Sequence, residues 1–234
     1  MTVMLRHGLG EDKAADPVLA RVNKRVVACR LCPRLTKYLD AAKLTWPDHR
    51  CTPVPAWGDA RPRLVIVGLA PGLHGANRTG RMFTFDSSGA WLYGMLHEVG
   101  LASRPVSERP GDGLKLRGVY ITAAARCAPP GNKPLPIELV TCRPYLKAEL
   151  AHLTGAAVLL ALGRIAHEAV LRCLDLKPGD YPFHHGAEFT LPDGRILLDS
   201  YHPSRQNTNT GLLTKPMWRA VFKRARTLMS RARK

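Results

Sequence analysis

Four cysteines have the residue type and part of the spacing of a metal site. Cys29 and Cys32 form a C-x-x-C pair, and Cys127 and Cys142 follow with fourteen residues between them. Four thiolates can close a tetrahedral zinc site or hold a [4Fe–4S] cluster. Zinc sites usually use two tight pairs, so the loose second pair favours iron without excluding zinc. A redox C-x-x-C is less expected, because the βαβ context of that motif is absent.

The other two cysteines, Cys173 and Cys51, are less favoured as functional residues. Cys173 lies on the apolar side of a predicted helix, where a thiol usually belongs to the core. Cys51 has no clear place and is a less favoured metal ligand. Six cysteines of an intracellular chain are expected to stay reduced, and their possible roles are then metal binding, catalysis or simple burial.

Three loops that directly follow apolar runs carry further polar groups. The loop at 68–80 contains four glycines, which let a backbone approach a ligand closely, but it lacks the ending of a Walker loop. The loop at 126–133 is stiffened by two prolines and carries Asn132, whose amide could recognise the edge of a base. The loop at 202–211 is polar and begins with His202. A surface turn or a structural histidine is the alternative in each case.

These loops must be positioned by a mainly parallel sheet. Four short runs rich in branched apolar residues, at 63–68, 118–123, 156–162 and 196–201, have the length of buried parallel strands. Helical patterns lie between and around them. Ligands of such sheets bind beyond the carboxyl ends of the strands. The predicted helices begin at Asp16-Pro17, with a stripe of Val18, Leu19, Val22 and Val26, and continue at 89–99, 141–153 (Pro144 in the first turn), 164–174 (with Ile165 on the apolar side) and 214–231.

The chain has the composition of a single globular domain. Residues 1–15 are expected to be flexible, and 16–234 to form one domain with an irregular stretch at 46–62. Lys and Arg total 35 against 18 acidic residues, a net charge of +17. Such an imbalance favours a nucleic-acid partner, with a membrane surface as the rival. No apolar run can span a bilayer and no signal peptide is evident, so a soluble intracellular protein is expected.

Taken together, the loops resemble the uracil-DNA glycosylase superfamily, and most closely its family 5, the type B enzymes. The resemblance extends from about Ala28 to Arg226. It rests on Cys29-Arg-Leu-Cys-Pro-Arg-Leu35, Gly68-Leu-Ala-Pro-Gly72, Gly75-Ala-Asn-Arg-Thr-Gly80, Met82-Phe-Thr84, Arg126-Cys-Ala-Pro-Pro130, Asn132-Lys-Pro134 and Tyr201-His-Pro-Ser-Arg-Gln-Asn207.

The resemblance implies a fold and a cofactor. The fold would be a three-layer α/β/α sandwich around a four-stranded parallel sheet. Cys29, Cys32, Cys127 and Cys142 would hold a [4Fe–4S] cluster with a structural role.

The resemblance also implies how a base would be held. A base must leave the helical stack before its glycosidic bond can be attacked. Phe83 would stack on the flipped base, and His202 would stabilise the departing base anion. The remaining substrate contacts would come from the glycine-rich loop, at Gly68, Leu69, Ala70 and Gly72.

Two departures from other branches change these expectations. Leu69 and Ala70 stand where those branches place a polar side chain, so the resemblance assigns water orientation to Asp86, whose alternative role is to cap the following helix. Ala123 replaces a base-reading Asn, and Asn132 is the expected substitute, supported by Asn207. A looser pocket would accept uracil and also hypoxanthine, ethenocytosine and hydroxymethyluracil.

Contacts with DNA outside the pocket are expected from the resemblance and from charge. Arg205 and Gln206 would enter the duplex, and Arg78 and Lys215 would bind phosphates. With no Schiff-base lysine evident, the enzyme should leave an abasic site. We expect a cytoplasmic, nucleoid-associated monomer. The alternative from another class is a non-catalytic nucleic-acid-binding protein stapled by a metal.

Overall fold

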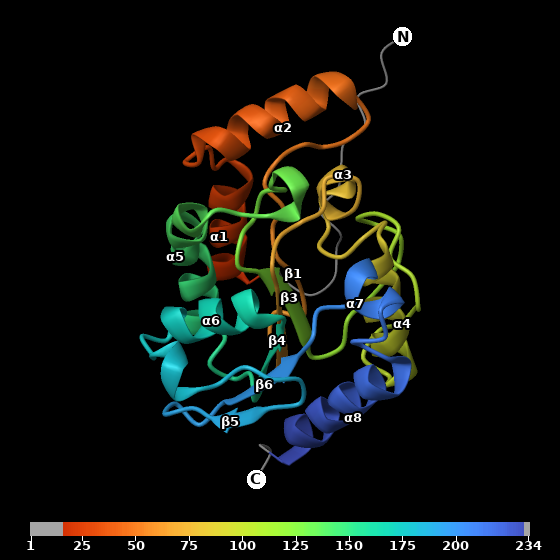
Figure 1. Cartoon of the computed structure of the whole chain (residues 1–234), viewed down its shortest axis with the longest axis vertical. Helices are drawn as coiled ribbons and strands as arrows, with labels where there is room; N and C mark the ends of the chain where they lie inside the picture. Colours follow the sequence, from red (N-terminus) through yellow and green to blue (C-terminus); the bar gives the residue numbers. More distant parts are fainter. Residues whose placement is uncertain (1–15, 232–234) are drawn as a thin grey trace.

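The computed structural model describes residues 16–231 and contains one six-stranded sheet (Figure 1). The four predicted runs form its parallel centre in the order β3-β2-β4-β6. Two short edge strands, which the sequence did not reveal, pair antiparallel at either side. The expected flexible segment 1–15 lies outside the described residues. The strands are β1 (Trp57–Gly58), β2 (Leu64–Gly68), β3 (Val119–Ala123), β4 (Val158–Leu162), β5 (Glu188–Thr190) and β6 (Ile196–Ser200).

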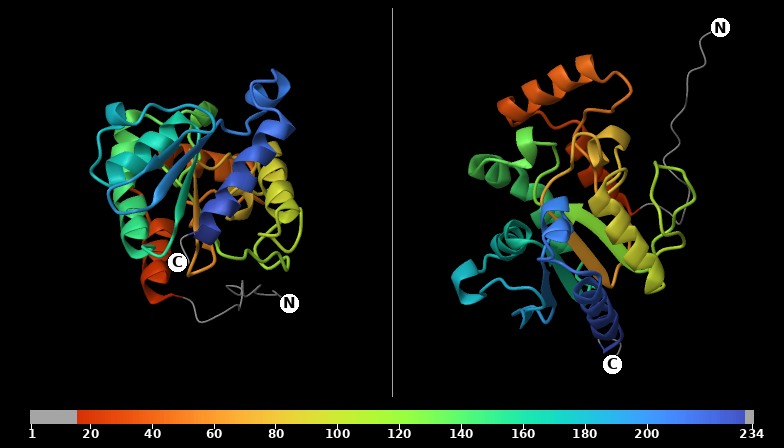
Figure 2. Two further views of the ribbon diagram at one scale, coloured as in Figure 1. Left: turned by 90° about the horizontal axis from the view of Figure 1, so that it is seen from below. Right: turned by 45° about the vertical axis from the view of Figure 1, so that its right-hand side comes forward.

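Helices cover both faces of the sheet, which confirms the predicted three-layer α/β/α architecture (Figure 2). Alternate residues of one strand face opposite layers: Ile66 packs toward α4 (Ser87–Glu98) and α8 (Lys215–Arg231), whereas Val65 and Val67 pack toward the other layer. That second layer consists of α1 (Pro17–Val27), α5 (Pro136–His152) and α6 (Arg164–Cys173). Because both faces are covered, all residues of β2, β3 and β4 are buried.

Several helix predictions need correction. Val18 and Ile165 are exposed, so neither belongs to the buried stripe of its helix. Helix α5 begins at Pro136 and not at 141, because Glu138 accepts a hydrogen bond from the backbone N–H of Leu135 and so caps an earlier first turn. Pro144 therefore lies inside α5 and not in its first turn; it is exposed there. By contrast, Asp16 caps α1 as predicted.

Helix α2 (Pro33–Thr45) was not predicted, although Pro33 at its first position and the buried side chains Leu35, Leu39 and Ala42 have helical spacing. It lies across one end of the molecule (Figure 1). The remaining short elements are α3 (Ala76–Thr79), η1 (Pro130–Asn132), η2 (Pro178–Asp180) and α7 (Arg205–Asn209).

The connections after β2, β3 and β6 lead into α3, η1 and α7. Parallel strands end on the same side of a sheet, so these three loops share one edge. No helix within residues 16–231 is long and apolar enough to cross a bilayer.

Candidate active site and candidate metal centre

Asp86 is a half-buried carboxylate at this edge of the sheet, and its two oxygens have different surroundings. Oδ1 accepts a 2.7 Å hydrogen bond from the backbone N–H of Gly89 and caps α4, so the alternative role of Asp86 as a helix cap is present. Oδ2 points at the glycine-rich loop, where it lies 3.7 Å from the position that a Cβ on Gly72 would take. Capping therefore leaves one carboxylate oxygen directed toward the loops.

Burial changes the acidity of this group. Desolvation raises the pKa of Asp86 above its ordinary value, and the positive charge of Arg205 opposes that rise. The pKa rises because burial disfavours the charged carboxylate. Asp86 therefore takes up a proton at a higher pH than an exposed aspartate does.

Two glycines in the loop after β2 make room for side chains of this chain. A Cβ on Gly68 would lie 2.8 Å from Cζ of Phe83, and a Cβ on Gly75 would overlap the carboxylate of Asp86. The sequence suggested that these glycines let a ligand approach. In the structure they first allow Phe83 and Asp86 to reach their positions.

Replacing Gly75 by Ala is expected to reduce base release about 100-fold, because a displacement of about 1 Å at a reacting group can have an effect of that size. The added methyl group would push Asp86 aside, and the backbone of Gly75, with φ −104° and ψ −113°, lies outside the regions that residues with a Cβ favour. Single-turnover rates check the prediction. Gly94→Ala is the matched control, because a Cβ there meets no atom within 4 Å and Ala favours the helix. Equal rates in both variants would contradict the expectation.

His202 is half-buried directly after β6, and its surroundings keep it uncharged. Desolvation lowers the pKa of His202 to about 4, so the ring is neutral at physiological pH. The ring of Phe83 lies nearly parallel to it, with centroids 6.2 Å apart and 28° between planes. Asn207 fixes the backbone here, because its Nδ2 donates a 2.8 Å hydrogen bond to the carbonyl of His202. Asn207 thus positions the histidine loop.

Asn132 approaches the same point of the glycine-rich loop as Asp86. Its Oδ1 is 3.9 Å from the position of a Cβ on Gly72, the same position that Asp86 approaches at 3.7 Å. The side chain is exposed, and the backbone has φ = 57°, a left-handed conformation that Asn tolerates better than most residues. Leu69 and Ala70, beside them, are half-buried, and Leu69 offers its carbonyl to the backbone N–H of Ala125.

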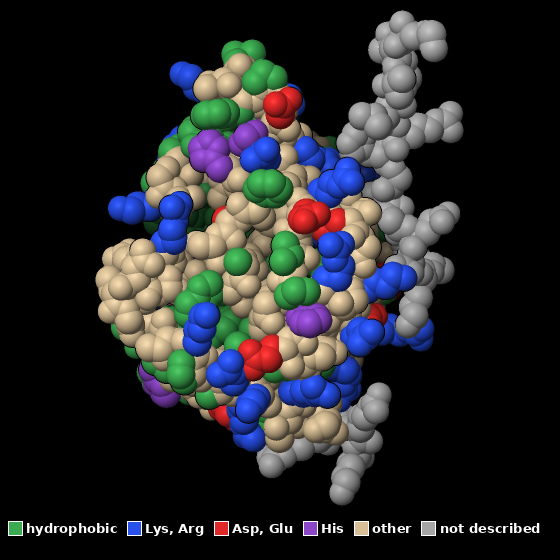
Figure 3. All heavy atoms as spheres, turned by 90° about the vertical axis from the view of Figure 1, so that its right-hand side faces the viewer, with side chains coloured by type: hydrophobic (Ala, Val, Ile, Leu, Met, Phe, Trp, Pro, Cys, Tyr) green, Lys and Arg blue, Asp and Glu red, His purple; other side chains and the backbone are tan. Residues whose placement is uncertain are grey.

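The residues predicted to contact DNA are exposed near this edge. Arg205 and Gln206 begin α7, Lys215 begins α8, and Arg78 lies in α3. Figure 3 shows Lys and Arg side chains spread over the face that carries α3, α4, α7 and α8, with fewer acidic ones among them. That distribution gives the face the positive charge that binding to a phosphate backbone requires.

Phe85 belongs to this surface, and the sequence analysis missed it. It is 55% exposed, directly precedes Asp86 and has φ = 69°. The guanidinium carbon of Arg78 lies 4.5 Å from the centroid of its ring. An exposed aromatic ring beside a cation is suited to stacking with a base. No sequence pattern marks this residue, because its exposure depends on the turn that buries Phe83.

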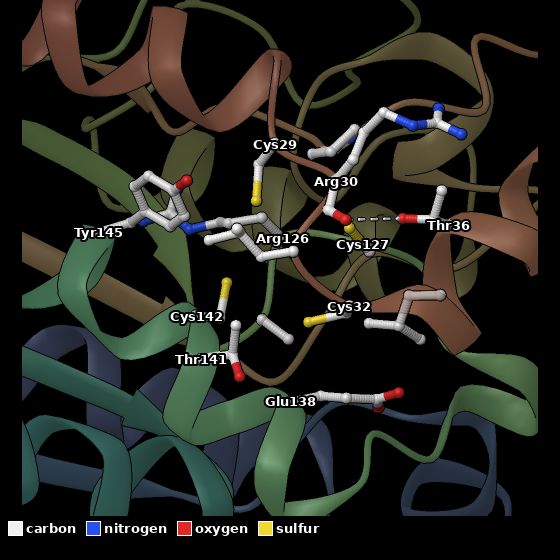
Figure 4. A pocket seen from close by; sticks show the side chains of 14 residues that line it. Cys29, Arg30, Cys32, Thr36, Arg126, Cys127, Glu138, Thr141, Cys142 and Tyr145 are labelled. Carbon is white, nitrogen blue, oxygen red and sulfur yellow. Dashed lines mark hydrogen bonds between the residues drawn. The ribbon is translucent and has the colours of Figure 1, made fainter.

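The four predicted metal ligands line one pocket (Figure 4). Cys29 and Cys32 come from the turn between α1 and α2, Cys127 follows β3, and Cys142 lies on α5. Cys51 and Cys173 are buried elsewhere. Within residues 16–231, no three His, Cys, Asp or Glu side chains converge on a point that would hold one metal ion. The four sulfurs stand around the walls of the pocket.

The cysteines affect one another electrostatically. Burial, and then the proximity of the thiolate of Cys142, raises the pKa of Cys127 to about 12, and burial raises that of Cys142 to about 11. Four thiolates in this pocket therefore require a positively charged group among them. The guanidinium of Arg126 lines the same pocket, and the sequence analysis treated that residue only as part of a loop.

The chain was compared with known proteins. The profile described as "Uracil DNA glycosylase superfamily" matches residues 55–226. The chain is 51% identical over 208 residues to the type-5 uracil-DNA glycosylase of Thermus thermophilus, covering 87% of this chain and 94% of that protein. The type-5 enzymes of Mycobacterium bovis and Pyrobaculum aerophilum are 44% and 42% identical, over 90% and 86% of this chain and 81% and 89% of those proteins. These matches confirm the resemblance that the loops predicted. The chain therefore belongs to the uracil-DNA glycosylase superfamily, within its type-5 branch.

Proposed function

We propose that this protein removes uracil from DNA by hydrolysing the N-glycosidic bond and leaves an abasic site. The observation that carries the proposal is Oδ2 of Asp86, which faces Gly72 and Gly75 where Asn132 also approaches Gly72. A carboxylate there suits the positive charge that develops on the sugar as the bond breaks. The positively charged face around the site suits a DNA partner.

The same groups suggest how the reaction proceeds. A water molecule attacks C1′ of the deoxyribose, the bond between C1′ and the base nitrogen breaks, and its electron pair leaves with the base. Asp86 orients the water, stabilises the cationic sugar and receives the proton that the water loses. His202, already neutral, donates a hydrogen bond to the departing anion. Asn132 binds the edge of the base, and Phe83 and the backbone at 68–72 enclose it.

We also propose that the pocket accepts hypoxanthine, ethenocytosine and hydroxymethyluracil. Ala123, at the end of β3, offers no side-chain hydrogen bond where a base-reading Asn would stand, and Asn132 is exposed on a separate loop. A base can be rejected strongly only where it leaves a buried polar group unpaired. This pocket carries few such groups.

A panel of oligonucleotides, each with one modified base, tests both proposals. After incubation with the protein, alkali cleaves every abasic site. Strand cleavage at uracil and at the other three bases is expected, and duplexes with normal bases should stay intact. Intact uracil strands at high protein concentration would refute the glycosylase proposal. Cleavage at uracil alone would refute only the broader substrate range.

The rate of base release should rise with pH through the raised pKa of Asp86 and then stay level through neutral pH. Asp86 must be ionised to act. Because its pKa is raised, acid protonates it, and so lowers the rate, at a higher pH than for an ordinary carboxylate. His202 has already lost its proton above about pH 4. Single-turnover rates from about pH 4 to about pH 9 check this. A rate that increases toward acid pH would instead indicate a cationic histidine.

We propose further that Cys29, Cys32, Cys127 and Cys142 hold a [4Fe–4S] cluster that stabilises the fold. The donor set is four thiols with no histidine, and all four sulfurs line one pocket (Figure 4). Two buried guanidinium nitrogens of Arg126 without partners also fit an anionic group there. When bound, the cluster supplies cross-links between α1, α2, β3 and α5. Iron and sulfide analysis of the pure protein tests this, and zinc without sulfide would refute it.

A further inference from the structure

Arg126 is a fully buried arginine whose charge is held by one carboxylate. Its Nη2 lies 2.5 Å from Oε2 of Glu149, a buried residue on α5. Glu149 also accepts hydrogen bonds from Oγ1 of Thr122 at 2.7 Å and from the hydroxyl of Tyr120 at 3.5 Å, both on β3. Glu149 is thus fully engaged, and the guanidinium is held in one orientation between sheet and helix.

The other two guanidinium nitrogens have no acceptor. Nε and Nη1 of Arg126 are buried and find no hydrogen-bond partner among residues 16–231. A buried donor without an acceptor costs about 1–3 kcal/mol, and more if charged. The side chain lines the cysteine pocket together with Cys29, Cys127 and Cys142 (Figure 4). The pocket thus offers sulfur atoms as acceptors.

We propose that Arg126 is a positioning residue for the group held by the four cysteines: its Nε and Nη1 donate hydrogen bonds to sulfur atoms of the cluster or of its cysteinates, and Glu149 fixes the guanidinium for this task. The proposal rests on the cluster proposed above. It explains why a chain retains a buried ion pair, which by itself contributes little to stability.

The charge of Arg126 should affect the cluster in two ways. Hydrogen bonds from a cation stabilise the anionic sulfurs of the cluster within the protein, so iron should be released slowly. A reduced cluster carries one more negative charge than an oxidised one, and the cation favours it. Arg126 should therefore raise the reduction potential of the cluster.

The test uses the double variant Arg126→Met/Glu149→Gln in the cluster-loaded protein. Methionine removes the donors and the charge, and glutamine keeps an acceptor for Thr122 without leaving a buried charge unpaired. Iron release to a chelator, followed by visible absorption well below the unfolding temperature, should become about 10- to 100-fold faster. The reduction potential, measured by redox titration, should fall.

The matched control is Arg81→Met/Asp112→Asn. It removes another buried ion pair, at 2.8 Å, whose residues do not line the cysteine pocket. If the first double variant does not fold, Arg126→Lys keeps an ammonium for Glu149 and removes the forked donors, and it should also release iron faster. Unchanged iron release and potential in the Arg126 variant that folds, or equal changes in the control, would overturn the proposal. Wild-type protein without iron would refute the cluster, and with it this role.

Discussion

Asp86→Asn is expected to reduce single-turnover release of uracil by about 10²–10³-fold, the usual effect of removing one preorganised electrostatic group from an active site. The substitution separates the two functions of this residue. Asn is as good a helix cap as Asp, so its side-chain oxygen can keep the hydrogen bond from Gly89. It removes only the negative charge that Oδ2 directs toward the glycine-rich loop.

Thermal unfolding measured beside the rates distinguishes chemistry from structure. Asp86→Asn should unfold near the wild-type temperature, whereas Asp86→Ala should also lose about 1 kcal/mol because the cap of α4 is gone. If Asp86 were only a cap, the Asn variant would release uracil at nearly the wild-type rate. That result would remove Asp86 from the proposed mechanism.

Cys127→Ala is expected to remove the proposed cluster and to lower the unfolding temperature by roughly 6–20 °C. The guanidinium of Arg126 would lose the anionic group on its pocket side, and leaving a buried charge uncompensated costs about 3–5 kcal/mol. In proteins of 150–250 residues, each kcal/mol corresponds to about 2–4 °C. The pocket joins α1, α2, β3 and α5, so its loss should loosen the end of the molecule that α2 covers.

Cys173→Ala is the matched control for this prediction. Cys173 is also buried, but it packs in the core between β-sheet and α6 and does not line the pocket. Its replacement should destabilise the protein only by the small cavity that it leaves and should keep the metal content unchanged. Equal metal content in both variants would show that Cys127 is not a ligand.

Regular elements were predictable wherever burial decided the pattern. The central strands are buried on both faces, so β2 and β4 show as continuous apolar runs such as 64–67, and β3 and β6 contain apolar runs. The edge strands β1 and β5 are short and partly exposed, and nothing in their composition separates them from loops. Helix α2 was missed for a different reason: its apolar stripe is narrow, with Leu35, Leu39 and Ala42 as its buried side chains.

The candidate site was predictable as a set of residues but not as an arrangement. The loop motifs supplied Asp86, Asn132 and His202, and parallel strands had to bring their loops to one edge. Neither the split role of the two Asp86 oxygens nor the contact of Asn207 with the backbone of His202 follows from spacing. Phe85 was missed because an apolar residue in a sequence is expected to be buried, and this one is not.

The sequence by itself determined the four central strands and the main helices between them, the charge that suits DNA and the identity of the four thiols. These features depend on composition and local periodicity, which are visible directly in the sequence. Only the tertiary structure decided that Cys29, Cys32, Cys127 and Cys142 line one pocket, and that Arg126 stands beside them with two donors unpaired. Burial and pairing are properties of neighbours distant in the chain, and the fold alone brings those neighbours together.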